Sequence, residues 1–263
     1  MSLQSQLTRM AQNVGALTAD TNAIFEALRA KGVNVPANAQ LSDVADMIES
    51  IVPPHQNEVE IGGRWYPYVQ IGNQLWLAEN LDYKFSYNGS TLPIGLNNLP
   101  STPAAWYYNN DEAAYGIDGT YKCGLLYNWY AAKYLDDNKD TLLPGEWHVP
   151  TSNELDTLAT NVGGTSIGGT KLKSLDNSVI QGFPSNWNGT NDYEFNAIPS
   201  GAKGEQFNNL GSRLNLWTLT EAQQDSALRY YLKPDSGIYY YVDSGIGDDK
   251  SVGYSLRLVR TIS

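Results

Sequence analysis

The hydrophobic positions at the start of the chain recur in alternating steps of four and three residues. From residue 1 to about 31 they are Leu3, Leu7, Met10, Val14, Leu17, Ile24 and Leu28, with Thr21 in the one missing place. Such a narrow seam is typical of a coiled coil, whereas a helix packed on its own chain usually has a wider apolar face. We therefore expect a helix that forms a homo-oligomer, with a trimer favoured. The alternative is an amphipathic helix packed on its own chain, with a break at residues 20–22.

A second short helix and a linker follow. Gly32 is expected to end the first helix, and Ser42 to begin a helix that presents Val44, Met47, Ile48 and Ile51. The two prolines at 53 and 54 cannot continue that helix. The pattern thus predicts a helical segment at 1–52, a proline-rich linker at 53–57 and a second domain at 58–263.

The second domain opens with strand patterns joined by turns. Residues 59–68 and 68–77 are predicted to form a strand pair, with Gly62-Gly63 and Gly72-Asn73 in the turns. The following segment, 82–102, is rich in Asn, Gly, Ser and Pro and is predicted to be a long surface loop. A helix is expected over 124–133.

The centre of the domain is a strand that leads directly into a helix. The apolar strand is expected to end at Pro150, and Thr151 or Ser152 with Glu154 forms a capping-box pattern before Leu155. Near the end of the chain, alternating patterns predict three strands at 227–233, 238–244 and 252–259.

Composition and charge exclude several functions. The net charge is −11 and the sequence pI is about 4.5, which argues against nucleic acid or an anionic membrane as partner. Cys123 is the one cysteine, so no intramolecular disulfide forms, and we expect a buried core residue. The chain starts without a leader-like pattern, and we expect it to fold in the cytoplasm.

The domain resembles a known family in six segments that follow one another in the family's order. They are 69–81, 106–112, 124–131, 147–151, 216–221 and 253–260, for example Trp147-His-Val-Pro-Thr151 and Gly253-Tyr-Ser-Leu-Arg-Leu-Val-Arg260. In these segments the chain resembles the Fibrobacter succinogenes major paralogous domain, a branch of the C-type-lectin-like fold related to formylglycine-generating enzymes. The resemblance implies an α+β domain with antiparallel strands and about two helices, and it says little about function.

The C-terminal strands carry the candidate ligand-binding residues. Alternation assigns Leu228, Tyr230 and Leu232 to the core, together with Ile238, Tyr240 and Val242. The opposite face and the loops beside it give the candidate ligand-binding set: Trp217, Gln223, Asp225, Arg229, Tyr231, Lys233, Tyr239, Tyr241, Asp243, Asp248 and Asp249. Tyr and Arg are common in binding hot spots, although an ordinary polar sheet face has a similar composition.

The resemblance also bears on how this surface varies. In lectin-like relatives the same region holds the ligand surface, and in some it is rewritten by diversity-generating retroelements. Those elements change adenine-containing codons, such as those for Asn, Tyr, Asp and Ser, and the C-terminal third is rich in these residues.

Catalysis finds little support in the sequence. The cysteine pair that holds copper in formylglycine-generating enzymes cannot exist with Cys123 alone, and we expect no cofactor and no metal. The acidic run 136–140 departs from the familiar calcium-loop pattern, since Thr141 stands at the glycine position and Trp147 at the glutamate position. His55 and His148 are more consistent with structural roles, and no spacing singles out a pair of carboxylates for glycoside hydrolysis.

The preferred hypothesis is therefore a non-enzymatic binding protein of a phage tail tip or fibre. Residues 23–32 and 41–51 resemble a short helical module near the start of many tail-fibre proteins. The expected partners are a host-cell surface protein or glycan and other virion tail proteins. A bacterial cell-surface adhesin or polysaccharide-binding protein is the alternative, and a carbohydrate-active enzyme is a third class.

Overall fold

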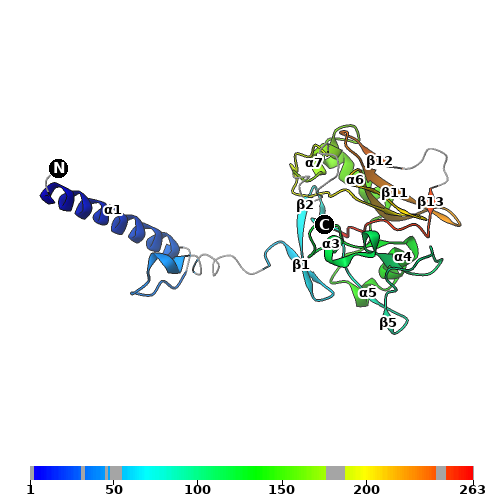
Figure 1. The fold of residues 1–263 in the computed structure, drawn as a ribbon, viewed down its shortest axis with the longest axis horizontal. Coiled ribbons are helices and arrows are strands. Elements are labelled where there is room, and N and C mark those ends of the chain that lie inside the picture. The colour runs from blue at the N-terminus through cyan, green and yellow to red at the C-terminus, as the bar shows by residue number, and fades with distance from the viewer. Residues whose placement is uncertain are drawn as a thin grey trace. The chain divides into compact units, whose positions relative to one another are not determined.

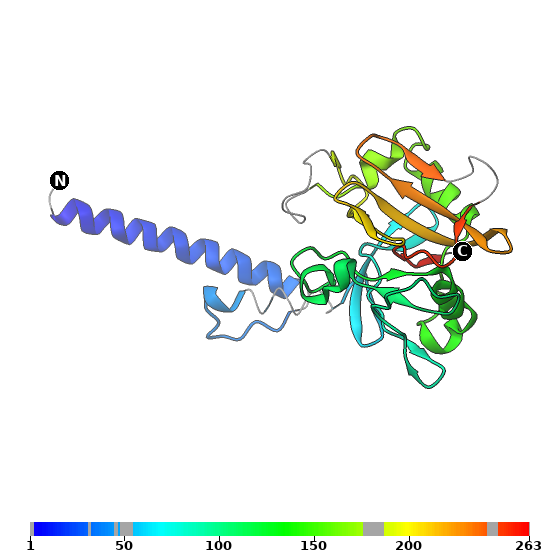
Figure 2. The same ribbon diagram turned by 45° about the vertical axis from the view of Figure 1, so that its right-hand side comes forward.

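The chain forms two compact units, residues 1–56 and 57–263, in the computed structural model shown in Figures 1 and 2. The structure describes residues 3–30, 33–44, 47, 55–175, 187–240 and 247–262. Each unit has a hydrophobic core of its own, small in the first and extensive in the second.

The first unit consists mainly of helix α1, Leu3–Ala30, which continues without a break through residues 20–22. The Thr21 hydroxyl donates a hydrogen bond to the Leu17 carbonyl, 2.8 Å away, so this polar residue is accommodated within the helix. Two residues of the predicted seam, Leu17 and Ile24, have 61% and 38% of their surface exposed. The side chains of Leu3, Leu7, Met10 and Val14 lie outside the described part of the chain.

A small core closes the C-terminal end of α1. Phe25 and Leu28 are buried together with Val35 and Met47. The second helix begins differently from the prediction, because a 3-10 turn occupies Leu41–Asp43 and the Asp43 carboxylate accepts from the Gln40 N–H at 2.8 Å. The expected continuation through Ile48 and Ile51 lies outside the described residues.

The second unit contains two larger sheets and two short strand pairs, and nearly all of its strand pairs are antiparallel. The first sheet has the order β1 (Glu58–Ile61), β2 (Arg64–Ile71), β3 (Gln74–Leu77) and β14 (Val259–Thr261). The second has the order β12 (Ile238–Tyr240), β11 (Ser226–Leu232), β10 (Leu214–Gln223), β8 (Ser200–Lys203) and β9 (Phe207–Leu210), with β13 (Asp248–Asp249) beside β11. The short pairs are β4 (Ser86–Tyr87) with β5 (Ser90–Thr91) and β6 (Ala105–Trp106) with β7 (Leu126–Tyr127).

Short helices complete this unit: α3 (Glu112–Tyr115), α4 (Trp129–Asp137), α5 (Lys139–Leu142), α6 (Ser152–Asn161) and α7 (Gly168–Leu172), with a 3-10 turn at Tyr108–Asn110. Mixed helix and sheet with mainly antiparallel pairing is the α+β class that the sequence predicted. The predicted opening strand pair is also confirmed, with its turns at residues 62–63 and 72–73.

The central strand-to-helix region forms as predicted on the helix side. Thr151 is the N-cap of α6, its hydroxyl accepts from the Glu154 N–H at 3.4 Å, and Glu154 accepts from the Thr151 N–H at 2.8 Å. Leu155 and Leu158 then pack into the core beneath the second sheet. The strand before it is reduced to one bridge, between His148 and the last strand.

Two other predictions were wrong in detail. The helix expected over 124–133 begins only at Trp129, because the Asn128 side chain accepts from the Ala131 N–H and fixes the start there. The segment 82–102 is not a simple surface loop, since Phe85 and Leu92 are buried on either side of the β4–β5 hairpin.

The segment at 253–259 runs through the interior instead of forming the predicted strand at 252–259. Its backbone bonds to five separate parts of the unit, for example from the Leu77 N–H to the Leu258 carbonyl (3.1 Å) and from the Tyr127 N–H to the Tyr254 carbonyl (2.7 Å). Because each partner takes only one or two residues, the segment makes isolated bridges, and regular pairing begins at Val259.

Candidate ligand-binding face

The second sheet separates its side chains as the alternation predicted. Tyr230, Leu232 and Ile238 are buried against α6 and α7, whereas Tyr231 and Tyr239 point away from this core and are half-buried. Tyr231 and Tyr239 are opposite each other in the antiparallel register of β11 and β12. The end of this face that carries Tyr231 and Tyr239 is therefore available for contacts outside the unit's own core, whereas Trp217 and Arg229, farther along the same face, are buried.

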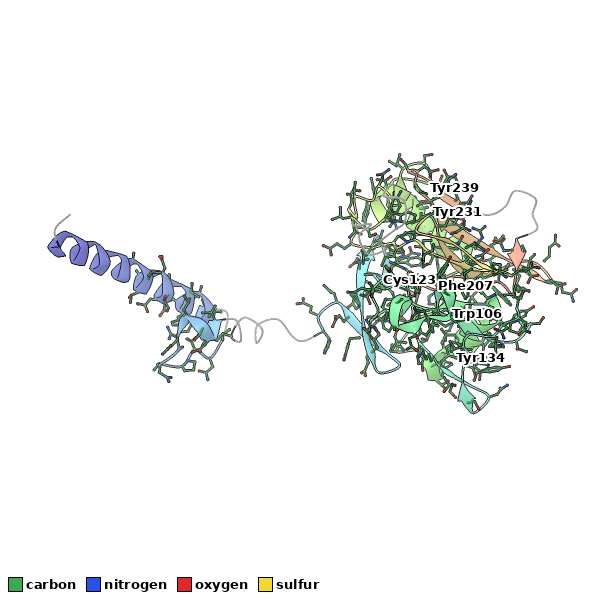
Figure 3. All side chains as sticks on the ribbon, in the orientation of Figure 1. Trp106, Cys123, Tyr134, Phe207, Tyr231 and Tyr239 are labelled. Atoms are coloured by element: carbon green, nitrogen blue, oxygen red, sulfur yellow. The ribbon has the colours of Figure 1, made fainter. Side chains whose placement is uncertain are left out.

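The two tyrosines form the centre of a row of stacked groups. Their rings are stacked with centroids 5.1 Å apart and an angle of 17° between the planes, and Figure 3 shows them adjacent on the second sheet. The Arg213 guanidinium lies 5.3 Å from the Tyr231 ring centre, and the Lys233 ammonium lies 4.2 Å from that of Tyr239. We call these four residues, Arg213, Tyr231, Tyr239 and Lys233, the tyrosine ladder.

Asp235 fixes the outer end of the ladder. Its carboxylate accepts from the Tyr239 hydroxyl at 2.8 Å and lies 3.1 Å from the Lys233 ammonium. The hydrogen bond to Asp235 raises the pKa of Tyr239 and also raises the pKa of Lys233. At neutral pH this end therefore presents an ammonium, a carboxylate and a neutral phenol in a fixed arrangement.

A hollow of about 450 Å³ adjoins this end of the ladder. It is lined by Thr165, Ser166, Gly237, Ile238 and Tyr239. A Cβ added at Gly237 would lie 2.7 Å from the Tyr239 ring, so the ring takes its place only because residue 237 is glycine. The hollow joins aromatic, hydroxyl and backbone groups, as small ligand sites do.

Arg229 supports the ladder from below and is not part of the exposed surface. It is only 6% exposed, it is paired with Asp248, and its Nη1 donates to the Asn215 side-chain oxygen at 2.9 Å. Its guanidinium also lies 4.7 Å from the Tyr231 ring centre. Arg229 and Asp248 therefore hold Tyr231 in place.

The structure divides the remaining predicted ligand-binding residues among different places. Trp217 is fully buried and its Nε1 donates to the Tyr127 carbonyl at 3.0 Å, so its side chain belongs to the core. Gln223, Asp225 and Asp249 are exposed at the β10–β11 turn and β13, at the far end of β11. That end is about 17 Å along the strand from Tyr231. The predicted Tyr241 and Asp243 lie outside the described residues.

Sequence reasoning missed two members of this face. Arg213 precedes β10 in a turn and enters the ladder because Asn215, two residues later, pairs with Tyr231. Asp235 was assigned only to a turn. The alternation of the strands could have indicated Arg213, but nothing in the local pattern places the Asp235 side chain against Tyr239.

The residues considered for catalysis have structural contacts. His148 Nε2 is 2.6 Å from a Glu154 carboxylate oxygen, and its Nδ1 is 2.9 Å from the Glu146 carbonyl. Cys123 is 1% exposed, and burial raises the pKa of its thiol to about 12. Within the described ranges, no group of three or more His, Cys, Asp and Glu side chains is arranged to hold a metal ion. The helices that the structure describes include none long and apolar enough to cross a membrane.

Residues 69–260 match the family described as the Fibrobacter succinogenes major domain, and the chain belongs to this family. The match covers the whole of the ladder and most of the second unit. The same chain matches neither a curated protein nor a solved structure.

Several residues of the segments that resemble the family are buried and form hydrogen bonds that join separate parts of the second unit. Trp76 is fully buried and donates to the Gln74 side chain at 3.1 Å. Asn128 is fully buried, caps α4, and donates to the carbonyls of Pro100 and Thr102. The residues that match the family are thus residues that build the fold. They carry no information about what the ladder binds.

Proposed function

We propose that this protein is a non-enzymatic binding protein whose tyrosine ladder recognises a protein or glycan on a host-cell surface. The observation that carries the proposal is the Tyr231–Tyr239 stack, held between Arg213 and Lys233 beside an open hollow. We further propose that the second unit has the C-type-lectin-like fold of the family's relatives. In that fold, the C-terminal sheet is the expected place for ligand contacts.

The geometry of the ladder favours binding because its side chains are already ordered. Fixing a flexible side chain on binding costs about 0.5–1.5 kcal/mol, and each ladder residue is restrained beforehand by a ring contact or a hydrogen bond. Tyrosine and arginine also supply large contact areas with few rotatable bonds. A ligand would contact ring edges, hydroxyl groups and the hollow, because the faces of both rings are already covered.

The setting we propose is the tail tip or fibre of a phage, with α1 as the oligomerising and attachment segment. Leu17 and Ile24 remain exposed on the single chain, which supports a helix that buries them against other copies. A trimer would present several ladders at once and gain avidity. A bacterial cell-surface adhesin would use the same face, and locating the protein in purified virions distinguishes the two settings.

The first experiment measures binding of the full chain to a panel of gut-type bacterial cells and surface glycans. The double variant Tyr231→Ala/Tyr239→Ala should weaken saturable binding at least about 30-fold, which corresponds to a hot spot of ~2 kcal/mol. Tyr115→Ala/Tyr121→Ala is the matched control, since those rings are also stacked and half-buried, with centroids 5.0 Å apart. Equal binding by both double variants would refute a role for the ladder.

A second experiment tests the proposed role of the first unit. Removal of residues 1–52 should convert an oligomer into a monomer in sedimentation and weaken binding to cells more than binding to a soluble monovalent ligand. An unchanged oligomeric state would place self-association elsewhere in the chain.

A further inference from the structure

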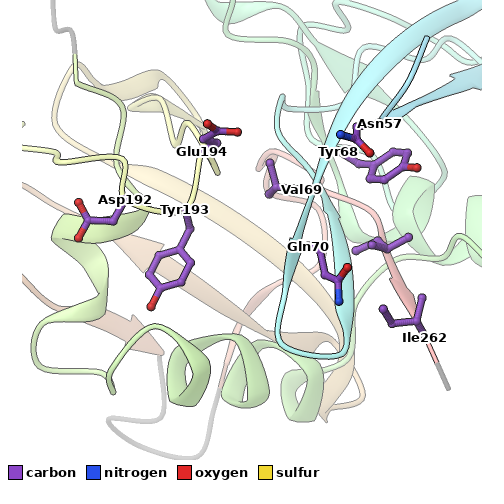
Figure 4. Close-up of a pocket in the computed structure, with 9 residues that line it drawn as sticks. Asn57, Tyr68, Val69, Gln70, Asp192, Tyr193, Glu194 and Ile262 are labelled. Atoms are coloured by element: carbon purple, nitrogen blue, oxygen red, sulfur yellow. The ribbon is translucent and has the colours of Figure 1, made fainter. Parts of the chain in front are cut away.

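A second hollow of the second unit lies on the first sheet, away from the ladder. Its volume is about 670 Å³, which falls within the size of small-molecule sites. Figure 4 shows the nine side chains that line it, from Asn57 just before β1, from β2 and β3, from the end of the chain and from the loop at 192–194. None of them belongs to the tyrosine ladder, so this groove is a separate feature of the unit. We call it the β2 groove.

The groove combines aromatic rings with hydrogen-bonding side chains on both faces of β2: Val69 faces the loop at 192–194, whereas Tyr68 and Gln70 point to the opposite face of the strand. Tyr68 and Tyr193 supply rings, and Gln70 adds an amide; Asp192 and Glu194 add carboxylates on the loop side. The aliphatic side chains Val69, Leu75 and Ile262 fill the remaining wall. The lining includes no Lys or Arg, and in the described ranges neither carboxylate has an ion-pair partner. This surface is unsuited to an anionic ligand.

The loop that forms one wall is held in an uncommon conformation. Asn191, Glu194 and Asn196 have φ values of 51°, 54° and 54°, in the left-handed region, which asparagine adopts more readily than most residues but which is uncommon for a residue such as Glu194. Such strain persists where the surroundings enforce it and is frequent at ligand sites. Here the Asn191 side chain accepts from the Asn196 N–H at 2.8 Å, and the Tyr193 hydroxyl donates to the Asn161 carbonyl at 3.2 Å.

The interior also fixes this wall. The buried Arg257 guanidinium donates to the Asn196 carbonyl at 2.9 Å and to the carbonyl of Phe195. On the opposite side, the Tyr68 ring packs on the Trp147 ring with centroids 5.6 Å apart. The backbone N–H of Tyr68 donates to the Asn57 carbonyl at 2.8 Å. Both walls are thus set before any ligand arrives, which lowers the cost of binding.

We propose that the β2 groove binds a segment of a neutral oligosaccharide. The hydroxyl groups of a sugar donate to carboxylates and both donate to and accept from amides, and the apolar face of a sugar ring fits against tyrosine and aliphatic side chains. A basic peptide is the main competing ligand. It is less favoured because exposed carboxylates contribute little to an ion pair in water, whereas the groove has rings and an amide beside its charges.

The test uses the full chain and neutral hexasaccharides of glucose, xylose and N-acetylglucosamine as probes, with saturation-transfer NMR and calorimetry. Gln70→Ala/Glu194→Ala should weaken binding of the preferred hexasaccharide at least tenfold. Gln206→Ala/Glu205→Ala is the control, because it removes the same two residue types, with the same charge change, from exposed positions on the β8–β9 hairpin. Near-UV circular dichroism confirms that each variant is folded.

The outcomes separate this proposal from the role of the ladder. Loss of saccharide binding in the groove variant, with normal binding by Tyr231→Ala/Tyr239→Ala, supports the β2 groove, whatever the ladder recognises. Absence of binding to all neutral probes at millimolar concentration overturns the proposal. Tighter binding of a polyuronide or of a lysine-rich peptide, abolished by Gln70→Ala/Glu194→Ala, also overturns it, because the ligand class would then be wrong.

Discussion

Replacing Arg257 with methionine should strongly destabilise the second unit. The Arg257 side chain is completely buried and donates to the Asn80 side-chain oxygen at 2.9 Å, to the Asn196 carbonyl at 2.9 Å, and to the carbonyls of Leu77 and Phe195. Methionine fills similar space but donates no hydrogen bond, so four acceptors lose a partner, three of them in fully buried bonds and one, the Asn196 carbonyl, in a partly buried bond.

The size of the loss follows from those four acceptors. At about 1 kcal/mol for each acceptor left without its donor, the total is ~4 kcal/mol. This is the low end of the range per group, chosen because methionine also removes the cost of burying a charge. For a unit of this size the change corresponds to a fall in Tm of roughly 8–16 °C. Arg257→Lys should recover only part of it, because a single ammonium cannot reach all four oxygens.

Tryptophan fluorescence during urea unfolding is a suitable assay, because all seven tryptophans lie in the second unit. The full chain can therefore be used and the signal still reports on this unit. Arg260→Met is the matched control. The Arg260 side chain is 42% exposed and lies 3.7 Å from Glu146, so its loss should cost less than about 1 kcal/mol. Equal stability of the two variants would refute the view that the four hydrogen bonds of Arg257 stabilise the second unit.

Two further predictions concern titrating groups in the second unit. Both ring nitrogens of His148 face acceptors, and the hydrogen bond with Glu154 raises the pKa of His148. An NMR titration should therefore find the pKa of His148 above 6.5. The pKa should be lower in Glu154→Gln, a variant that keeps the capping pattern. The stability gained from this pair is complete below pH 6.5 and is lost as the pH rises through the pKa of His148 in the folded protein; equal pH dependence in the variant would contradict this. Because burial raises the pKa of Cys123 to about 12, a thiol reagent at pH 8 should react only after unfolding, and rapid reaction of the native protein would show that the thiol is accessible.

The sequence predicts those parts of the fold that depend on neighbouring residues. The opening hairpins follow from glycine turns and alternation, and the start of α6 follows from Thr151 and Glu154, three positions apart. The division of the β11 side chains between two faces was also predicted, because period two fixes it once a strand forms, but the prediction that Arg229 lies on an exposed ligand face was wrong, since Arg229 is buried. The start of α4 was missed, since the Asn128 cap depends on a side-chain orientation that a helical spacing of aromatic residues does not show.

Contacts between distant residues account for what the sequence did not predict. The segment at 253–258 has the alternation of a strand, but its partners lie at five separate places in the chain, and no local pattern shows that they are not one continuous strand. The β2 groove joins Gln70 with Glu194, and the ladder joins Arg213 with Tyr239. In each case the site exists only after the sheets have assembled.

The residues that match the family and those that form the ladder contribute differently to the stability of the fold. Asn80 and Arg257 are 177 positions apart and bonded in the interior, so a change in either removes hydrogen bonds from buried groups. Tyr231, Tyr239 and Lys233 contact mainly one another and groups at the edge of the sheet, so their replacement leaves few buried acceptors without a donor. A surface of this kind can change its side chains while the fold persists. This physical independence supports the proposal that the ladder is a recognition surface, and it makes that surface suitable for diversification.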